Sequence, residues 1–155
     1  MLHLIAPCVL IGVVAGLRTM LAPALISWAA YLGWLPLGDS WLAFLGYTYT
    51  PWILTVLAVG ELVIDKHPST PSRKTPMAFL GRMLSGALCG AALGVAGAAM
   101  IVGSVLGLVG AVIGTLGGFA VRVRLASAFG RDLPAALIED VVAIGGALLI
   151  VAIAT

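Results

Sequence analysis

Residues 83–121 read MLSGALCGAALGVAGAAMIVGSVLGLVGAVIGTLGGFAV and include no charged side chain. A helix that crosses the hydrocarbon core of a bilayer needs about 20 apolar residues, so this stretch supplies most of two such helices in succession. No charged residue marks the turn between them. We place that turn near Val102–Ser104, between a helix over Met77–Val102 and a second helix over Gly103–Val121.

The composition of the whole chain also favours a membrane environment. Hydrophobic residues make up 62% of the 155 residues and charged residues only 9%, whereas soluble proteins carry about 25% charged residues. So few charges cannot cover a surface in water, and we therefore expect the apolar side chains to contact the lipid bilayer. The net charge of +2 is too small to indicate nucleic acid as a partner.

Four further apolar segments complete the expected architecture. Arg18 and Thr19 separate the first two segments, which form either two helices joined by a tight turn or one helix broken at Arg18. Thr50-Pro51 is a typical helix start, with a hydroxyl at the N-cap and proline at the first position. We predict an all-α polytopic membrane bundle of about six transmembrane helices, or five if the first two form one broken helix. The four segments are Leu4–Leu17, Met20–Leu35, Pro51–Asp65 and Ala135–Ala154.

One polar segment divides this single membrane domain, which covers residues 1–155. Residues 67–76 read HPSTPSRKTP, and their three prolines exclude a regular helix. We expect a cytoplasmic loop there, between a first three-helix half over residues 1–66 and a second over residues 77–155. Such a division suits the inverted repeats of transporters, but the two halves share no clear sequence similarity.

The basic residues give the expected orientation. With the N-terminus outside and six crossings, every lysine and arginine falls on the cytoplasmic side, while Asp39 falls outside. This distribution follows the positive-inside rule. The aromatic residues between Trp28 and Trp52 would form a belt at one membrane interface.

Two sets of glycines repeat at four-residue spacing, which places each set on one helix face. Small residues on such a face let two helix backbones approach closely, and helix association in lipid depends on such packing. We expect the two helices to pack against each other through these faces, and a homo-oligomeric seam is the alternative. The glycines are Gly86, Gly90 and Gly94 in the first helix, and Gly110, Gly114 and Gly118 in the second.

Ionisable residues within apolar helices are costly and usually face a protein interior, a partner or a water-filled cavity. Glu61 and Asp65 are one turn apart and share a helix face. Glu139 and Asp140 are adjacent, so only one of them easily faces the same cavity. Two interpretations stay open: a polar cavity that binds a cation or carries protons, and a set of salt bridges that fixes the helices. The candidates for the cavity are Glu61, Asp65, Glu139, Asp140 and Arg18, with Arg82 and Arg122 as charge partners.

No motif of an enzyme, a metal site or a cofactor site is present in the sequence. The two cysteines, Cys8 and Cys89, lie in apolar runs without the spacing of a zinc or redox motif. We found no HExxH, P-loop or GxSxG pattern. We therefore expect no cofactor, no metal and no catalysis. The leading hypothesis is a transporter or channel for a cation, a proton or a small solute, and the alternative is a scaffold or assembly subunit that packs through its glycine faces.

Several stretches resemble a bacterial family of small membrane proteins, the domain-of-unknown-function family 4126. The resemblance implies a bacterial inner-membrane protein with no assigned activity. It places Arg18, Glu61, Asp65, Arg73 and Glu139 in matching stretches but assigns them no role. The stretches are GVVAGLRTMLAPALISWAA (12–30), GWLPLGDSWLAFLGY (33–47), PWILTVLAVGELVIDKHPSTPSR (51–73), RMLSGALCGAALG (82–94), AVIGTLGGFAVR (111–122) and LPAALIEDVVAIGGALLIV (133–151).

Overall fold

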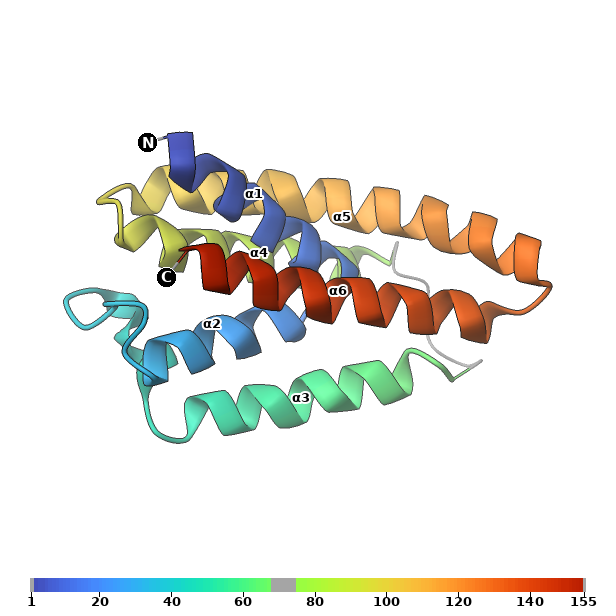
Figure 1. Ribbon diagram of the computed structural model, residues 1–155, viewed down its shortest axis with the longest axis horizontal. Coiled ribbons are helices and arrows are strands. Elements are labelled where there is room, and N and C mark those ends of the chain that lie inside the picture. Colours follow the sequence, from blue (N-terminus) through green and yellow to red (C-terminus); the bar gives the residue numbers. More distant parts are fainter. Residues whose placement is uncertain (1, 68–74, 155) are drawn as a thin grey trace.

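The computed structural model describes residues 2–67 and 75–154, and within these ranges it is built from helices without strands (Figure 1). This confirms the predicted all-α fold. Most of the expected polar loop and Arg73 lie outside the described residues. The helices are α1 (Leu2–Leu17), α2 (Leu21–Tyr31), the 3₁₀ helix η1 (Trp41–Gly46), α3 (Thr50–Ile64), α4 (Pro76–Val95), α5 (Met100–Phe129) and α6 (Asp132–Ala154).

Among the described residues, three helices, α4, α5 and α6, are long and apolar enough to cross a membrane. They contain 20, 30 and 23 residues, which correspond to lengths of about 30, 45 and 35 Å. By contrast, α1, α2 and α3 contain 16, 11 and 15 residues. The predicted count of six transmembrane helices is therefore not confirmed.

The first apolar region forms two helices, α1 and α2, rather than one broken helix. Figure 1 shows that the start of α1 and the end of α2 lie at the same end of the molecule. The two helices meet well short of the opposite end. Arg18 at their junction is fully buried, with 0% of its surface exposed. The expected cytoplasmic turn at Arg18 is therefore the buried tip of a helical hairpin.

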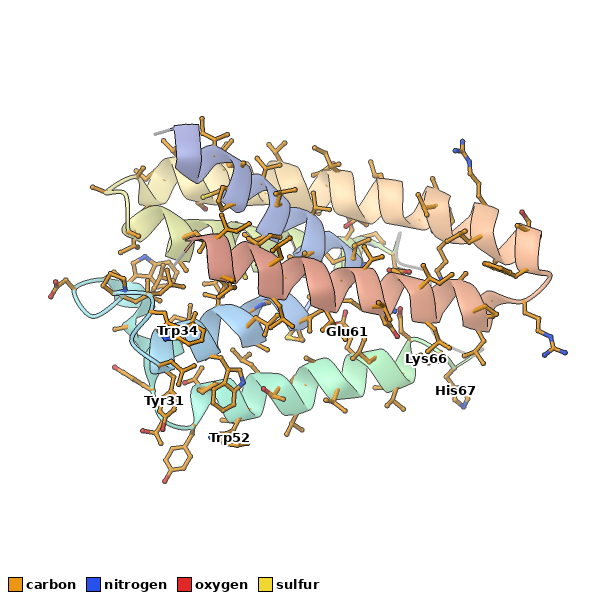
Figure 2. The ribbon with its side chains drawn as sticks, viewed as in Figure 1. Tyr31, Trp34, Trp52, Glu61, Lys66 and His67 are labelled. Atoms are coloured by element: carbon orange, nitrogen blue, oxygen red, sulfur yellow. The ribbon has the colours of Figure 1, made fainter. Side chains whose placement is uncertain are left out.

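The two ends of the molecule differ in chemistry. The N- and C-termini lie at one end, and Tyr31, Trp34 and Trp52 gather there, whereas Lys66 and His67 lie toward the other end (Figures 1 and 2). Trp28 packs edge-on against Trp52, with 5.0 Å between the ring centroids. We name the end with Tyr31, Trp34 and Trp52 the aromatic end, and the end toward which Lys66 and His67 lie the charged end.

The turn between α4 and α5 lies at residues 96–99, before the expected position at Val102–Ser104. Ala98 has a positive φ of 53°, and the amide of Ala99 donates to the carbonyl oxygen of Gly94 at 2.9 Å. The absence of a side chain on Gly94 lets the Ala99 backbone approach closely. The tight turn therefore depends on backbone contacts. No charged residue marks its position in the sequence.

Helix α5 continues past the expected end at Val121 and includes Arg122 and Arg124. Gly130 terminates it in the left-handed conformation, with φ +66°, which is the usual role of glycine after a helix. Helix α6 then begins at Asp132 instead of Ala135. The two arginines did not end the helix, because arginine is a good helix former.

The start of α3 also differs in detail from the expectation. The helix begins at Thr50, but the Thr50 hydroxyl donates to the carbonyl oxygen of Phe44 at 2.7 Å and does not cap the helix. Pro51 does occupy the first turn, as predicted. The hydroxyl therefore fixes α3 to η1.

Both glycine faces are used inside the chain, with different partners. A Cβ atom at Gly90 would overlap the backbone of Gly103 and Gly107 on α5, so α4 and α5 pack at their glycines as expected. The second face contacts α1 instead, because a Cβ atom at Gly110 or Gly114 would overlap the backbone of α1. Gly86 and Gly94 continue the first face, and Gly118 lines a groove described below.

Helix α1 packs mainly against α4 and α5. The two three-helix halves expected from the sequence therefore interlock in space. Helix α3 instead packs chiefly against α2 and η1 and buries only Pro51 and Ala58.

Candidate functional site

The buried hairpin tip leaves the last carbonyl groups of α1 and the first amide groups of α2 inside the bundle. Such groups lack partners within their own helices. Glu61 on α3 supplies two acceptors for α2: its carboxylate accepts from the amide of Thr19 at 2.7 Å and from the amide of Met20 at 2.8 Å. A negative charge at this position also complements the dipole of α2.

At the end of α1 the side chains are hydrogen-bond donors, whereas Glu61 at the start of α2 is an acceptor. Arg82 on α4, which is 4% exposed, donates to the carbonyl oxygens of Gly16 at 2.6 Å and Leu17 at 3.2 Å. The Ser85 hydroxyl donates to the carbonyl oxygen of Thr19 at 2.5 Å. The Thr115 hydroxyl lies 3.3 Å from the carbonyl oxygen of Gly16. A cation at the end of α1 complements that helix dipole as well.

Arg18 connects two helices at the centre of the site. Its guanidinium pairs with Asp65 at the end of α3 and with Asp140 on α6. Lys66 also reaches Asp140, at 2.8 Å. Asp140 is 6% exposed, so the pairs are largely shielded from water and interact strongly.

Arg122 extends the cluster toward the charged end. Its Nε and Nη2 atoms donate to the two carboxylate oxygens of Asp132 at 2.9 and 2.6 Å. Its Nη1 atom lies 3.2 Å from Asp65 and 3.7 Å from Glu139. Hydrogen-bonded and charge-charge contacts thus link α3, α5 and α6.

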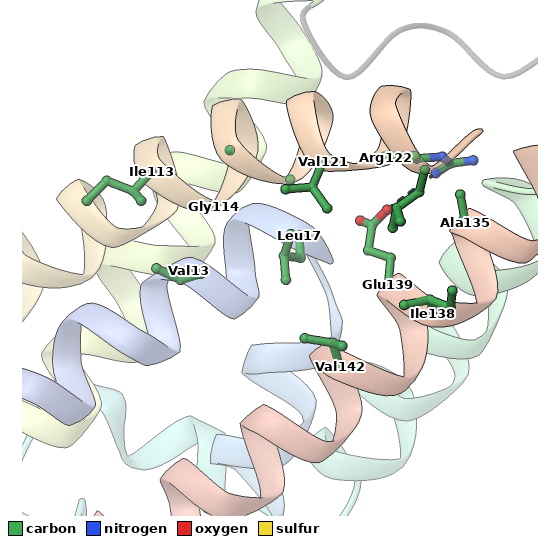
Figure 3. A pocket seen from close by; sticks show the side chains of 13 residues that line it. Val13, Leu17, Ile113, Gly114, Val121, Arg122, Ala135, Ile138, Glu139 and Val142 are labelled. Carbon is green, nitrogen blue, oxygen red and sulfur yellow. Dashed lines mark ion pairs between the residues drawn. The ribbon is translucent and has the colours of Figure 1, made fainter. Parts of the chain in front are cut away.

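An apolar groove adjoins this cluster between α1, α5 and α6 (Figure 3). Its volume is about 300 Å³, and Arg122 and Glu139 form its polar end. Its walls include Leu17, Ile113 and Val142. Glu61 does not line this groove, so Glu61 and Glu139 do not meet in it.

The structure brings most of the predicted residues into one cluster. Arg18, Asp65 and Asp140 meet directly, and Arg122 joins them through Asp65. Glu61 and Arg82 flank the cluster on the helix ends. The sequence did not identify four further participants, Lys66, Ser85, Thr115 and Asp132. Serine and threonine in an apolar run carry no signal that separates a buried hydrogen bond from ordinary packing.

The cluster contains acids and bases but no arrangement of metal ligands. Across residues 2–67 and 75–154, no group of three or more histidine, cysteine or acidic residues could hold a metal ion. The cluster can exchange protons and rearrange its ion pairs, because a carboxylate has both a charged and a neutral form.

Family models, curated proteins and solved structures yield no match to the chain. The resemblance to family 4126 therefore stays a prediction.

Proposed function

We propose that the chain is a small integral membrane transporter that carries a proton or a small cation by rearranging the buried charge cluster. The observation that carries the proposal is Arg18, which is fully buried at the tip of a helical hairpin and shared by Asp65 and Asp140. The bacterial inner membrane, with the charged end in the cytoplasm, is the proposed location.

The hairpin supports this proposal because discontinuous helices are a recurrent feature of transport sites. Helix ends that meet inside a membrane protein present unpaired backbone dipoles to ions and to charged side chains. In this chain, Glu61 and Arg82 occupy the two helix ends. Intramembrane charges of this kind usually mark ion or proton pathways.

A shared arginine supports a switch between two states. When a proton neutralises Asp140, the attraction of this residue for Arg18 and Lys66 weakens, and Asp65 holds Arg18 alone. Asp140 lies on α6 and Asp65 at the end of α3, so proton uptake would loosen one helix relative to the other. The Nε atom of Arg18 is buried without a hydrogen-bond partner among the described residues, and buried donors without a partner are rare in native structures.

A carrier fits the cluster better than an open channel. The acids are neutralised by nearby guanidinium groups, and the groove beside them has almost entirely apolar walls. A continuous polar pore would need hydrated walls. The cation therefore has to move with a rearrangement of the ion pairs.

Proton flux into proteoliposomes tests the proposal. We expect the wild type to move protons or a monovalent cation above the rate of empty liposomes, and Asp140→Asn to reduce this flux to the background. Asp39→Asn is the matched control, because Asp39 is exposed in the loop before η1. Absence of flux in the wild type, or equal flux in Asp140→Asn, would contradict the proposal.

A second candidate is a non-transporting assembly subunit. Helix α3 favours it, because α3 exposes apolar side chains on most of its surface, including Val56 at 70% and Val63 at 66%. The glycine faces, for which a homo-oligomeric seam was the alternative prediction, are already covered within the chain, so α3 is the better surface for a partner helix or a second copy. Loss of a co-purifying partner in Val56→Asn, with no flux in the wild type, would favour this function.

A further inference from the structure

The charged end of α3 is fixed to the rest of the bundle mainly by ion pairs and hydrogen bonds. We propose that α3 is a gate over the buried hairpin tip. The helix pivots about its packed aromatic end, and Asp65 and Lys66 form a latch that keeps its charged end closed. The proposal rests on the transport function proposed above, which it deepens by naming the helix that moves.

The two ends of α3 are held in different ways. At the aromatic end, Pro51 and Ala58 are buried, and the indole Nε1 of Trp28 donates to the hydroxyl of Thr55 at 2.9 Å. Toward the charged end, none of the residues 59–67 is buried. Close packing, on which helix association in lipid depends, is therefore concentrated at the aromatic end of α3.

A cavity adjoins the middle of α3. Its volume is about 560 Å³, and its walls include Leu54 of α3, Pro23 of α2 and Leu84 of α4. Helix α3 lies at one edge of the bundle (Figure 1) and packs chiefly against α2 and η1. Segments with few buried apolar contacts open at a low cost in free energy. Helix α3 can therefore change its tilt while the other helices keep their packing.

Four charged side chains form a closed ring at the charged end of α3. Arg18 at the hairpin tip pairs with Asp65 at the end of α3 and with Asp140 on α6. Lys66, the neighbour of Asp65, completes the ring through Asp140 at 2.8 Å. The formal charges of the two acids and two bases cancel. Two consecutive residues after α3 thus bind two different parts of the bundle.

Lys66 is the member of this ring that water reaches most easily. Its side chain is 27% exposed, compared with 12% or less for the other three. Its ammonium group also donates to the carbonyl oxygen of Leu62 at 3.1 Å, so it keeps a partner when it leaves Asp140. Water screens an accessible ion pair, and a proton on Asp140 would remove the charge that holds Lys66. The latch therefore opens first at Lys66, while Asp65 still contacts Arg18 and Arg122.

Opening of the latch would give water access to the hairpin tip. In the closed state, Glu61 of α3 accepts from the amides of Thr19 and Met20 at 2.7 and 2.8 Å, and Arg18 is fully buried. When the charged end of α3 moves away, water can replace the Glu61 carboxylate at these amides. The cluster then becomes accessible from the charged end, as alternating access requires of a carrier.

Pulsed electron paramagnetic resonance of the protein in lipid nanodiscs tests the gate with two pairs of spin labels. Val63→Cys with Val123→Cys reports the distance between α3 and α5 toward the charged end. Ile53→Cys with Val105→Cys reports the distance between the same helices toward the aromatic end. All four side chains are more than half exposed, and the two native cysteines are buried.

Lys66→Gln should lengthen and broaden the distance at the charged end by several Å and leave the distance at the aromatic end unchanged. Asp140→Asn, which removes the charge that a proton would neutralise, should have the same effect. The double variant Asp65→Asn with Lys66→Gln removes both parts of the latch and should lengthen the distance further. Arg124→Gln is the matched control, because it removes the same charge from an exposed position on α5, and it should change neither distance.

Two results would overturn the gate. Distances at the charged end that are equal in Lys66→Gln, Asp140→Asn and Arg124→Gln would exclude the latch, even if the wild type transports protons. Equal lengthening of both distances in Lys66→Gln would exclude a pivot at the aromatic end. Conversely, the expected distances without proton flux in the wild type would support the movement of α3 and contradict the proposed transport.

Discussion

Glu61 holds the start of α2 with both carboxylate oxygens, at 2.7 and 2.8 Å from two backbone amides. Arg82 does the converse at the end of α1. At the scale of single residues, these two side chains replace the water that exposed helix ends would bind. Their charges therefore have a structural role even if the cluster also transports protons.

Replacing Glu61 with glutamine should lower the free energy of unfolding by about 1–2 kcal/mol, in the range of lost helix caps. The glutamine side chain has one acceptor oxygen, and its NH₂ group would face a second N–H donor. Thermal unfolding in detergent micelles measures the change, with Asp39→Asn as the control that stays near the wild type. A Glu61→Gln protein as stable as the wild type would show that the amides find other acceptors.

Glycine decides the packing at the scale of helices. Gly90 allows backbone contact between α4 and α5, whereas Gly60 on α3 has open space around its Cβ position. The same residue type therefore has opposite consequences in the two helices. Only the structure separates them, because the sequence gives both as glycine within an apolar helix.

Alanine at these two positions should change stability in opposite directions. Gly90→Ala should destabilise the protein by about 1–3 kcal/mol, because the added methyl group forces the helix backbones apart. Gly60→Ala should stabilise it by up to about 1 kcal/mol through helix propensity. Unfolding of both variants in the same detergent measures the difference, and a stabilising Gly90→Ala would disprove the close contact.

The sequence predicted the helices well because hydrophobic runs and prolines are local signals. Pro51 and the break at Arg18 both fall where the structure has a helix start and a helix junction. The burial of Arg18 was not predictable from the sequence, because the hairpin tip is buried by partner residues on α3, α4 and α6. The end of α5 was also missed: Arg122 signals polarity, but arginine is a good helix former, and the helix continues to Phe129.

At the scale of the whole molecule, charge and aromatic content separate along the long axis. Both termini and the aromatic residues lie at one end, and the ion pairs around Lys66 lie toward the other (Figures 1 and 2). A bilayer placed across α4, α5 and α6 would have one interface at each end. The hairpin of α1 and α2 would then enter from the aromatic end and return to it, so its polar tip would lie within the membrane.

This arrangement predicts which positions are reached from outside the cell. The loop between α2 and η1, which contains Asp39, lies at the aromatic end, and the turn between α5 and α6, which contains Arg131, lies at the charged end (Figure 1). In intact bacterial cells that express the chain, an impermeant thiol reagent should label Asp39→Cys and should label Arg131→Cys only after the membrane is opened. The native cysteines should give little background, because Cys8 and Cys89 are 1% and 0% exposed. Labelling of Arg131→Cys alone in intact cells would reverse the orientation, and labelling of both would contradict a chain that spans the membrane.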